Sequence, residues 1–565
     1  MRRLRTSAQR GRVRVDGLLA VAVLAVIGGV ALAALLVDPP DRPGRVTADA
    51  PTVPDTASGD GDDGGDGTTG HASPGSSASD GAAAGPGTDG TQDGGDADGP
   101  RRAPWMVPAR GSLLHGSRYG SVDGFLVFRG NPTRTFYGEG PVPRDPAIAW
   151  SAPSERMCSV EELAEERKVW CGVGWTGQVV LLDNGGDGIT AVEVMVGGYD
   201  GGFHTFDGAT GAPTRPPFMA GQMFKGTETL DPDGYPLAYA GARDGFLRVL
   251  ALDGDRAGDR GSAPRELWRL GRHPEGVWND DWDANPTVLD DVLYAGGEDS
   301  WFRMWRLNRA YDARGRVTVD PELLVEVPGF DDALIARIGD RNVSIESSPA
   351  VTADRVYWAN SGGRVMGIDR LAALEGRVVV TFDHWVGDDV DASIVVDRDG
   401  MLIVAVEEQR RLPAAEGMGQ LLRLDPSRPD DPVLWRLDIP AVPGVEGADG
   451  GVWATPALYG DHIYVPTHSG RLLVVTLDDG TVVSNEFLGG PLWSSPAIVE
   501  EPGGPAWLVQ ATCGRPSVRG YTLEDPASPV LRWSVPMPGC IEATPVVWRG
   551  SIYVGTRDGR VHALR

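Results

Sequence analysis

Carboxylates and indoles recur at one position of a repeated step in this chain of 565 residues. Five stretches read DANPTV, ESSPAV, WATPAL, WSSPAI and EATPVV, and each opens on an acidic residue or a tryptophan. Carboxylates can hold a cation or move a proton, and an indole can stack on a flat ligand. With the related stretches of the chain, the position offers seven candidate ligand-binding residues: Trp175, Asp283, Glu346, Asp391, Trp453, Trp493 and Glu542.

Two of these acids end acidic runs, which suggests a metal site. On an extended strand, side chains two residues apart share a face, so each run presents two carboxylates together. Glu346 belongs to the repeat between them. Hard oxygen ligands from three neighbouring repeats suit Ca²⁺, which is the one cofactor that these residues suggest. The predicted site comprises Asp281, Asp283, Glu346, Asp389 and Asp391; the alternative is a solvated acidic rim whose members cap loops and pair with arginine.

The remaining chemistry-bearing residues give weaker signals. Trp453 and Trp493 could stack on a quinone or a sugar, although packing between sheets is the alternative for these and the other tryptophans. The eight histidines lack the spacing of a metal site or a catalytic triad. No GxSxG, Walker or HExxH motif is present, so no catalytic residue is assigned.

A strand pattern that recurs along the chain must position these residues. Short alternating strands end at Leu-Asp-like corners that are 46 to 61 residues apart, at Asp207, Asp253, Asn308, Asp369, Asp425, Asp478 and Glu524. Asp-Gly and Ser-Gly turns between the strands suit tight hairpins. This period, with strands alone between the corners, is typical of a β-propeller, in which each repeat forms one sheet.

Eight repeats can be counted, and the ends of the pattern predict how the ring closes. The repeat that starts at Asp391 is the least regular, so seven blades remain an alternative. The last repeat, 540–565, has length for only three strands. The segment 146–150 (PAIAW) matches an outer strand and is expected to complete that sheet, which would remove an open edge. Residues 328–339 are expected to form a turn of helix between blades.

The small-residue and proline steps, the Gly-containing turns and corners such as TFDGATG resemble those of the PQQ-like (quinoprotein) β-propeller superfamily over about residues 120–565. That superfamily includes quinoprotein dehydrogenases and non-enzymatic propellers related to an outer-membrane-protein assembly factor. The stretch 128–143 and the run NDDWDANP resemble exported, actinobacterial-type members. The resemblance implies an all-β, eight-bladed propeller.

The same resemblance implies what a dehydrogenase would need. PQQ enzymes of this kind hold Ca²⁺ with carboxylate and amide, use an aspartate base and place a tryptophan beneath the quinone. Asp283, Glu346 and Trp493 could take these roles. The adjacent Cys-Cys pair of many members and a haem CxxCH motif are both missing, which argues against PQQ.

The first 103 residues of the sequence predict a membrane tether. Six arginines in 1–16 precede 21 uncharged residues, 17–37, enough to cross a hydrocarbon core of about 30 Å. The basic tail should stay in the cytoplasm and the rest should lie outside the cell membrane. A cleaved signal peptide is the alternative. Residues 38–103 are rich in Gly and Asp and should be a disordered linker, which leaves 104–565 for the propeller.

The cysteines indicate the compartment of the protein, and its net charge limits the possible partners. The four cysteines, Cys158, Cys171, Cys513 and Cys540, suggest two disulfides in an oxidising compartment, and pairing of sequence neighbours is the simplest of three connectivities. The net charge is −27, of which residues 104–565 carry −23, so nucleic acid should be repelled.

Three functional hypotheses follow. The first is a membrane-tethered, non-catalytic binding or scaffold module for an envelope protein or a ligand. The second is a PQQ- and Ca²⁺-dependent dehydrogenase of alcohols or sugars, and the third is a polysaccharide-binding propeller.

Overall fold

The computed structural model describes residues 116–163, 166–174, 177–184, 192–253, 261–441 and 450–565. None of the helices in these ranges combines the length and apolarity that a membrane span requires. The predicted cytoplasmic tail 1–16, span 17–37 and linker 38–103 lie outside the described residues.

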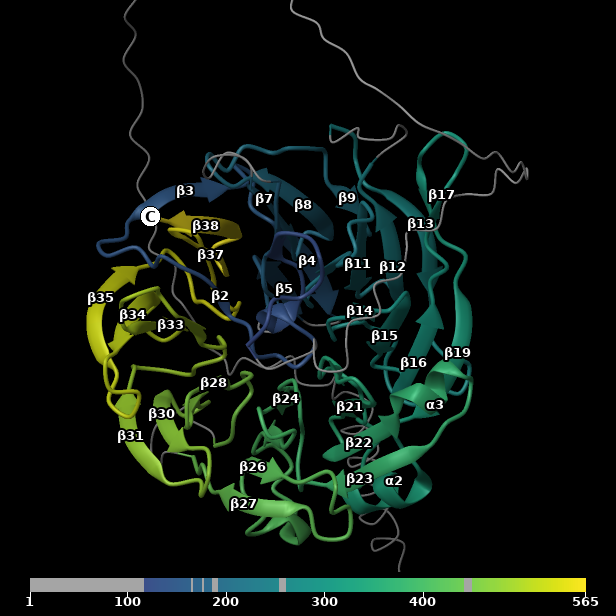
Figure 1. Cartoon of the computed structure of the whole chain (residues 1–565), viewed down its shortest axis with the longest axis vertical. Coiled ribbons are helices and arrows are strands. Elements are labelled where there is room, and N and C mark those ends of the chain that lie inside the picture. The colour runs from purple at the N-terminus through teal and green to yellow at the C-terminus, as the bar shows by residue number, and fades with distance from the viewer. Residues whose placement is uncertain (1–115, 164–165, 175–176, 185–191, 254–260, 442–449) are drawn as a thin grey trace, which may run out of the picture. The chain divides into compact units, whose positions relative to one another are not determined.

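The described chain forms eight radial sheets around a common axis, here called blades 1 to 8 (Figure 1). The count of eight is confirmed, and the repeat at Asp391 forms a complete four-stranded sheet. Blade 1 consists of β1 (Gly124–Phe125), β6 (Val180–Asp183), β7 (Val192–Gly197), β8 (Gly202–Asp207) and β9 (Phe218–Met219), and blade 2 of β10 (Thr229–Leu230), β11 (Leu237–Ala242), β12 (Phe246–Ala251) and β13 (Arg265–Leu270). Blade 3 consists of β14 (Thr287–Leu289), β15 (Val292–Gly296), β16 (Trp301–Arg306) and β19 (Glu322–Pro328), and blade 4 of β20 (Ala350–Val351), β21 (Arg355–Ala359), β22 (Arg364–Asp369) and β23 (Val380–Trp385).

Blades 5 to 8 follow the same order, from the innermost strand outward. Blade 5 consists of β24 (Val395–Val396), β25 (Leu402–Ala405), β26 (Leu421–Leu424) and β27 (Val433–Leu437), and blade 6 of β28 (Ala457–Tyr459), β29 (His462–Pro466), β30 (Arg471–Thr476) and β31 (Val482–Phe487). Blade 7 consists of β32 (Ala497–Val499), β33 (Ala506–Thr512), β34 (Ser517–Leu523) and β35 (Val530–Pro536), and blade 8 of β2 (Gly138–Glu139), β36 (Val546–Trp548), β37 (Ser551–Thr556), β38 (Arg560–Leu564) and β3 (Ile148–Ala152).

Short elements decorate the ring. Two hairpins stand outside the blades, β4 (Cys158–Leu163) with β5 (Glu166–Cys171), and β17 (Ala310–Tyr311) with β18 (Val317–Thr318). The helices are α2 (Asp332–Ile338), α3 (Arg370–Leu374) and the 3-10 turns η1 (Phe128–Gly130) and η3 (Pro413–Ala415). Asp331 caps α2 by accepting the Leu334 N–H at 2.7 Å, which confirms the predicted turn of helix.

Both ends of the propeller sequence complete blade 8. β3 pairs antiparallel with the C-terminal strand β38, with Trp150 opposite Ala563, so the predicted closure is confirmed. The second contact, in which β2 pairs in parallel with the inner strand β36, was not predicted from the sequence. The two N-terminal strands cover the edges that β36 and β38 would otherwise expose.

A segment near the N-terminus of the propeller, Phe128–Tyr137, occupies the channel at the end where the inner strands finish. Arg134 donates to Pro349 O at 2.6 Å and Thr287 Oγ1 at 2.7 Å, on blades 4 and 3. Arg129 donates to the Pro456 carbonyl of blade 6 at 3.0 Å and to the Pro496 carbonyl of blade 7. Both arginines are buried. Because it contacts blades on several sides of the axis, this segment, here called the plug, fills that end of the channel.

Hydroxyl side chains of the repeated step link successive inner strands. The Asn285 N–H donates to Ser348 Oγ at 3.0 Å, the Ser348 N–H to Ser393 Oγ at 3.0 Å, and the Ser393 N–H to Thr455 Oγ1 at 3.0 Å. The Thr455 N–H continues the chain to Ser495 Oγ at 2.9 Å. The hydroxyl of each of these steps therefore satisfies a buried amide of the preceding blade, which explains the small polar residues of the motif.

Replacing Thr455 by valine should test this linkage. Valine keeps the shape but leaves the Ser393 amide without an acceptor, so the free energy of unfolding should fall by about 1 to 3 kcal/mol. Thr455→Ser retains the hydroxyl and should cost less than about 1 kcal/mol, the value of one methyl group. Urea unfolding of both variants measures the difference. Equal losses would show that the hydroxyl contributes nothing.

Candidate functional site

The candidate residues gather at the mouth of the channel opposite the plug, where the inner strands begin. Asp283 is fully buried, and Asp391, Trp453, Trp493 and Glu542 are almost so. Glu346 is half-buried, and Trp175 lies outside the described residues. All six described residues directly precede inner strands, as their shared sequence position predicted.

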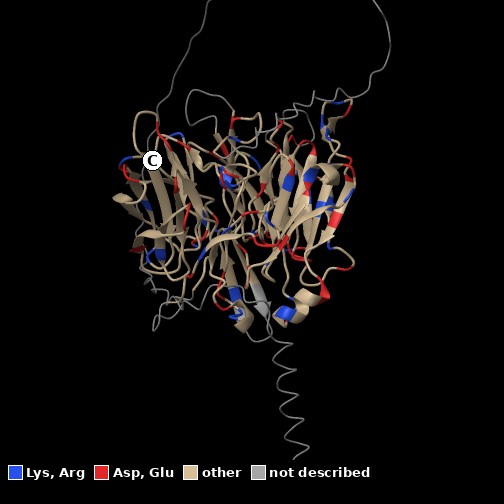
Figure 2. Ribbon diagram, turned by 60° about the horizontal axis from the view of Figure 1, so that its bottom comes forward, with Lys and Arg blue, Asp and Glu red and all other residues tan. Residues whose placement is uncertain are grey.

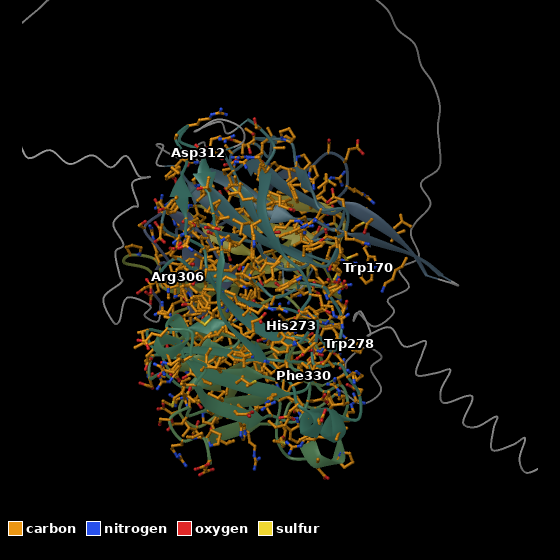
Figure 3. The ribbon with its side chains drawn as sticks, turned by 90° about the vertical axis from the view of Figure 1, so that its right-hand side faces the viewer. Trp170, His273, Trp278, Arg306, Asp312 and Phe330 are labelled. Atoms are coloured by element: carbon orange, nitrogen blue, oxygen red, sulfur yellow. A yellow bond between two sulfur atoms is a disulfide. The ribbon has the colours of Figure 1, made fainter. Side chains whose placement is uncertain are left out.

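The β4–β5 hairpin lies on the mouth side and stands away from the ring, with Trp170 at its base (Figure 3). The Cys158–Cys171 disulfide joins its strands there, and Cys513–Cys540 is the second disulfide. Both are the neighbour pairs that the sequence suggested. Trp170 anchors the hairpin through an edge-on contact with Tyr199 at 6.0 Å between ring centroids.

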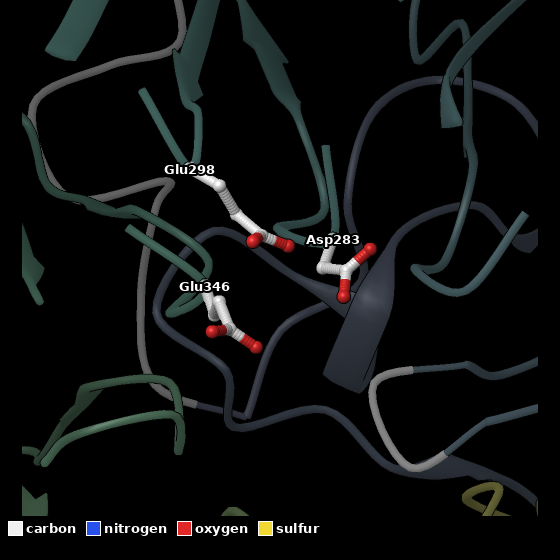
Figure 4. A group of neighbouring side chains, drawn as sticks. All are labelled: Asp283, Glu298 and Glu346. Atoms are coloured by element: carbon white, nitrogen blue, oxygen red, sulfur yellow. The ribbon is translucent and has the colours of Figure 1, made fainter. Parts of the chain in front are cut away.

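The first acidic group of the mouth joins Asp283, Glu298 and Glu346, whose carboxylates turn toward one another (Figure 4). Lys225 Nζ lies 2.5 Å from Asp283 Oδ2 and 3.8 Å from Glu346 Oε2. Arg243 adds a second cation, 3.3 Å from the same oxygen of Asp283. The positive charge that these carboxylates require therefore comes from side chains of the protein.

The carboxyls of this group differ in protonation. Burial acts to raise the pKa of Asp283, but the charges of Lys225 and Arg243 outweigh it and hold this pKa below its usual value. Burial raises the pKa of Asp281 to about 7 despite Arg243. Burial also raises the pKa of Glu298 well above its usual value, and the negative charges of Asp283 and Glu346 add to the shift. The surroundings thus favour the charged form of Asp283 and the protonated form of Glu298.

The second acidic group joins the buried carboxylates of Asp389, Asp391 and Glu407. Arg410 Nη1 lies 3.8 Å from Asp389 Oδ2 and 3.6 Å from Asp388 Oδ1. The carboxylate of Asp388 accepts three successive backbone N–H groups, those of residues 409 to 411, at 2.7 to 3.0 Å. This aspartate orders the loop that carries the arginine.

The five residues of the predicted Ca²⁺ site are thus divided between two groups. Asp283 and Glu346 lie in the first, with Asp281 beside them at 3.4 Å from Arg243 Nε, whereas Asp389 and Asp391 lie in the second. Sequence reasoning missed Glu298 and Glu407, which follow the second strands of their blades. The end of a second strand lies at the mouth beside the start of the first, so this signal was present in the pattern. Lys225 was also visible, as one of only two lysines in the chain.

Trp453 and Trp493 contact each other across neighbouring blades. Their rings stack at 5.8 Å with an interplanar angle of 22°, and His468 meets Trp453 edge-on at 4.1 Å. The Cys513–Cys540 disulfide packs against the pair. The indoles are only 7% and 3% exposed, so a quinone or sugar would have to displace these contacts before it could stack.

A Ser-His-Asp arrangement in blade 8 has a structural explanation. Ser151 Oγ lies 2.7 Å from His562 Nδ1, and His562 Nε2 lies 3.2 Å from Asp558 Oδ1. Blade 2 has the same connection built from other residues, since Arg248 bonds Asp244 of the turn and Glu266 of the outer strand, each at 2.8 Å. The arrangement ties the turn to the outer strand.

The three residues that could bind PQQ and Ca²⁺ in a dehydrogenase are poorly suited to these roles. A base must be able to accept a proton, but Asp283 is held as an anion by two cations. The space beside Asp283 and Glu346 that a calcium ion would need is approached by the Lys225 ammonium. Trp493, the proposed floor, already stacks on Trp453.

Replacing Lys225 should show how much its ammonium group contributes to the stability of the fold beside the buried Asp283. Lys225→Met leaves Asp283 buried with one cation fewer, so the free energy of unfolding should fall by about 3 kcal/mol. Lys168→Met, at the only other lysine, removes a contact with the Trp170 ring and should cost under about 1 kcal/mol. Ca²⁺ should raise the melting temperature of Lys225→Met but not that of the wild type. A rise in the wild type that Asp283→Asn abolishes would instead support the Ca²⁺ site predicted from sequence.

The raised pKa of Glu298 predicts a pH effect of definite sign. Because its pKa is higher in the folded chain, the unfolded chain loses this proton first, and stability falls as pH rises above about 4.5. Glu298→Gln has no proton to lose. The melting temperature of the variant relative to wild type should therefore increase between pH 5 and pH 8. A difference that stays constant across this range would show that Glu298 is ionised in the folded protein.

Comparisons with known proteins identify the fold. The sequence matches no protein-family model and no curated protein. Among solved structures, it resembles BamB from Moraxella catarrhalis (12% identity, TM-score 0.33, 74% of this chain and 97% of that one) and Sqt1 from Saccharomyces cerevisiae (9%, 0.47, 66% and 92%). It also resembles a quinohemoprotein alcohol dehydrogenase from Comamonas testosteroni, at 12% identity and a TM-score of 0.50 over 81% of this chain and 83% of that one. The structure and this likeness to the dehydrogenase show the fold alone, an eight-bladed β-propeller.

Proposed function

We propose that this chain is a membrane-tethered binding module of the cell envelope, which engages a partner protein or ligand through its mouth face and catalyses no reaction. The observation that carries the proposal is the pairing of Asp283, the aspartate considered above as a possible base, with Lys225 and Arg243. Two cations beside a buried carboxylate favour its charged form and make it a weak proton acceptor.

The layout of the propeller supports binding at the mouth. The plug fills the opposite end of the channel, so a ligand would approach from the mouth. The β4–β5 hairpin on that side presents two exposed apolar side chains, Val160 and Val169, which face each other across the strands. Exposed apolar side chains on a disulfide-stapled hairpin suit a contact with another protein.

The proposed location rests on the sequence. Residues 1–16 and 17–37 have the charge and length of a cytoplasmic tail and a single membrane span, and 38–103 have the composition of an extended tether. Two disulfides fit an oxidising compartment outside the cell membrane. The charge of −23 on residues 104–565 disfavours nucleic acid.

The dehydrogenase and binding hypotheses give opposite results in one assay. Purified full-length chain in detergent should show no dye reduction above background when PQQ, Ca²⁺ and a panel of alcohols and sugars are added. Substrate-dependent reduction that Asp283→Asn abolishes would establish the dehydrogenase and overturn the binding proposal.

Cross-linking should then locate the binding face. A photo-reactive amino acid at Val160 or Val169 should give the same single adduct in intact cells. The same group at Val530, which is similarly exposed on the outer strand of blade 7, should not give it. An identical adduct at all three positions would show that the mouth face has no special role.

A further inference from the structure

A pocket of about 600 Å³ opens beside the second acidic group, on the mouth side of blade 5. Three segments form it: residues 386–388 before the blade, the long connection between β25 and β26, and residues 438–440 after β27. A volume of this size is typical of ligand pockets. Glu407 of the acidic group also lines the pocket, so the two features are continuous.

Carboxylates line this pocket from its floor to its rim. Glu407 is buried, Glu408 is half-buried, and Glu416 and Asp438 are exposed. Asp388 is the fifth, but its oxygens already accept three backbone N–H groups. One arginine, Arg411, lines the pocket and lies 3.6 Å from Glu408. Five acids against one base give the pocket a negative potential.

The apolar part of the lining suits the stem of a long basic side chain. Val386 and Val406 are buried in the wall, and Leu412, Pro413 and Pro440 complete it. Lysine and arginine bury their methylene stems against apolar surface while the charged head meets polar groups. Carboxylates at graded depth beside an apolar wall match both halves of such a side chain.

The charge of the whole domain points to the same partner. Acidic and basic residues are interspersed over the propeller (Figure 2), yet residues 104–565 carry −23. Such a field raises the rate of encounter with a basic partner and opposes an acidic one. The first acidic group is paired with Lys225 and Arg243, whereas the pocket of blade 5 has a surplus of acids.

We propose that the blade 5 pocket receives an arginine or lysine side chain from a basic segment of the partner. This inference rests on the proposed binding function and adds the chemistry of the partner. A protein segment is favoured over a free amine because the pocket exceeds the volume of one side chain and opens on the same face as the β4–β5 hairpin.

Binding of a defined peptide to full-length chain in detergent tests the inference. The probe is a labelled nonapeptide with the sequence Gly-Leu-Arg repeated three times, and its matched control has glutamine in place of arginine. In the pocket variant, Glu408→Gln, Glu416→Gln and Asp438→Asn are combined. The charge-matched control combines Asp430→Asn, Asp431→Asn and Asp478→Asn, three exposed acids on loops at the other end of blades 5 and 6.

The pocket variant should weaken the Kd of the arginine peptide at least tenfold, and the control variant should change it less than threefold. Equal loss in both variants would show that the peptide senses only the overall charge, and would overturn the inference. Equal binding of the glutamine peptide would overturn it as well. Tight binding of free arginine would make the pocket a small-molecule site, again against the inference. Equal melting temperatures confirm that both variants are folded.

The two proposals can fail separately. If the mouth cross-link adduct forms in the pocket variant as it does in the wild type, and the arginine peptide does not bind, this inference fails while the binding function stands. If the peptide binds the pocket but no mouth-specific adduct forms, the binding function fails while the pocket's preference for cations stands.

Discussion

The hydrogen bonds around the channel axis are the constraint on which the rest of the propeller depends. Each inner strand is covered on both sides by neighbouring blades, so the polar groups that its own sheet leaves unpaired must be satisfied by those neighbours or by the plug. The hydroxyl of one step accepts the amide of the step before it, from Ser348 to Ser495. This linkage fixes the positions of the inner strands of blades 3 to 7 along the channel axis. The residue two positions before each hydroxyl is thereby fixed at the mouth, which explains why acids and indoles from distant repeats meet there.

Charge is balanced differently at the two ends of the same channel. At the plug, burial lowers the pKa of Arg129 to about 10 and that of Arg134 to about 9, and backbone carbonyls accept their hydrogen bonds. At the mouth, Lys225 and Arg243 compensate the first acidic group, and Arg410 lies beside the second. Buried charges are tolerated where hydrogen bonds or opposite charges replace water, so each end has found its own compensation.

The sequence predicted the features that recur in every blade, but it did not predict those that occur only once. Corners, turns and proline steps recur with each blade, so the eight sheets and the closing strand β3 could be predicted from pattern alone. The plug occurs once, and Arg134 meets Pro349 across 215 residues, a distance over which no periodicity operates. The shared position of the mouth acids along the channel axis was also predictable. Their grouping was not, because it depends on which blades are adjacent and on where Glu298, Glu407 and the basic side chains enter between them.

The acids at the mouth thus differ in how their negative charge is compensated. In the first group the cations are built in, since Lys225 is buried against Asp283, and an incoming cation would have to displace an ammonium that is already paired. In the blade 5 pocket the acids reach from buried Glu407 to exposed Asp438, so an incoming cation would exchange water for carboxylates in steps. The cost of desolvating a charge is lowest where polar partners replace water progressively. Recognition of a basic partner is therefore favoured beside the axis, where acid is in surplus, rather than on the axis, where the propeller has neutralised its own charge.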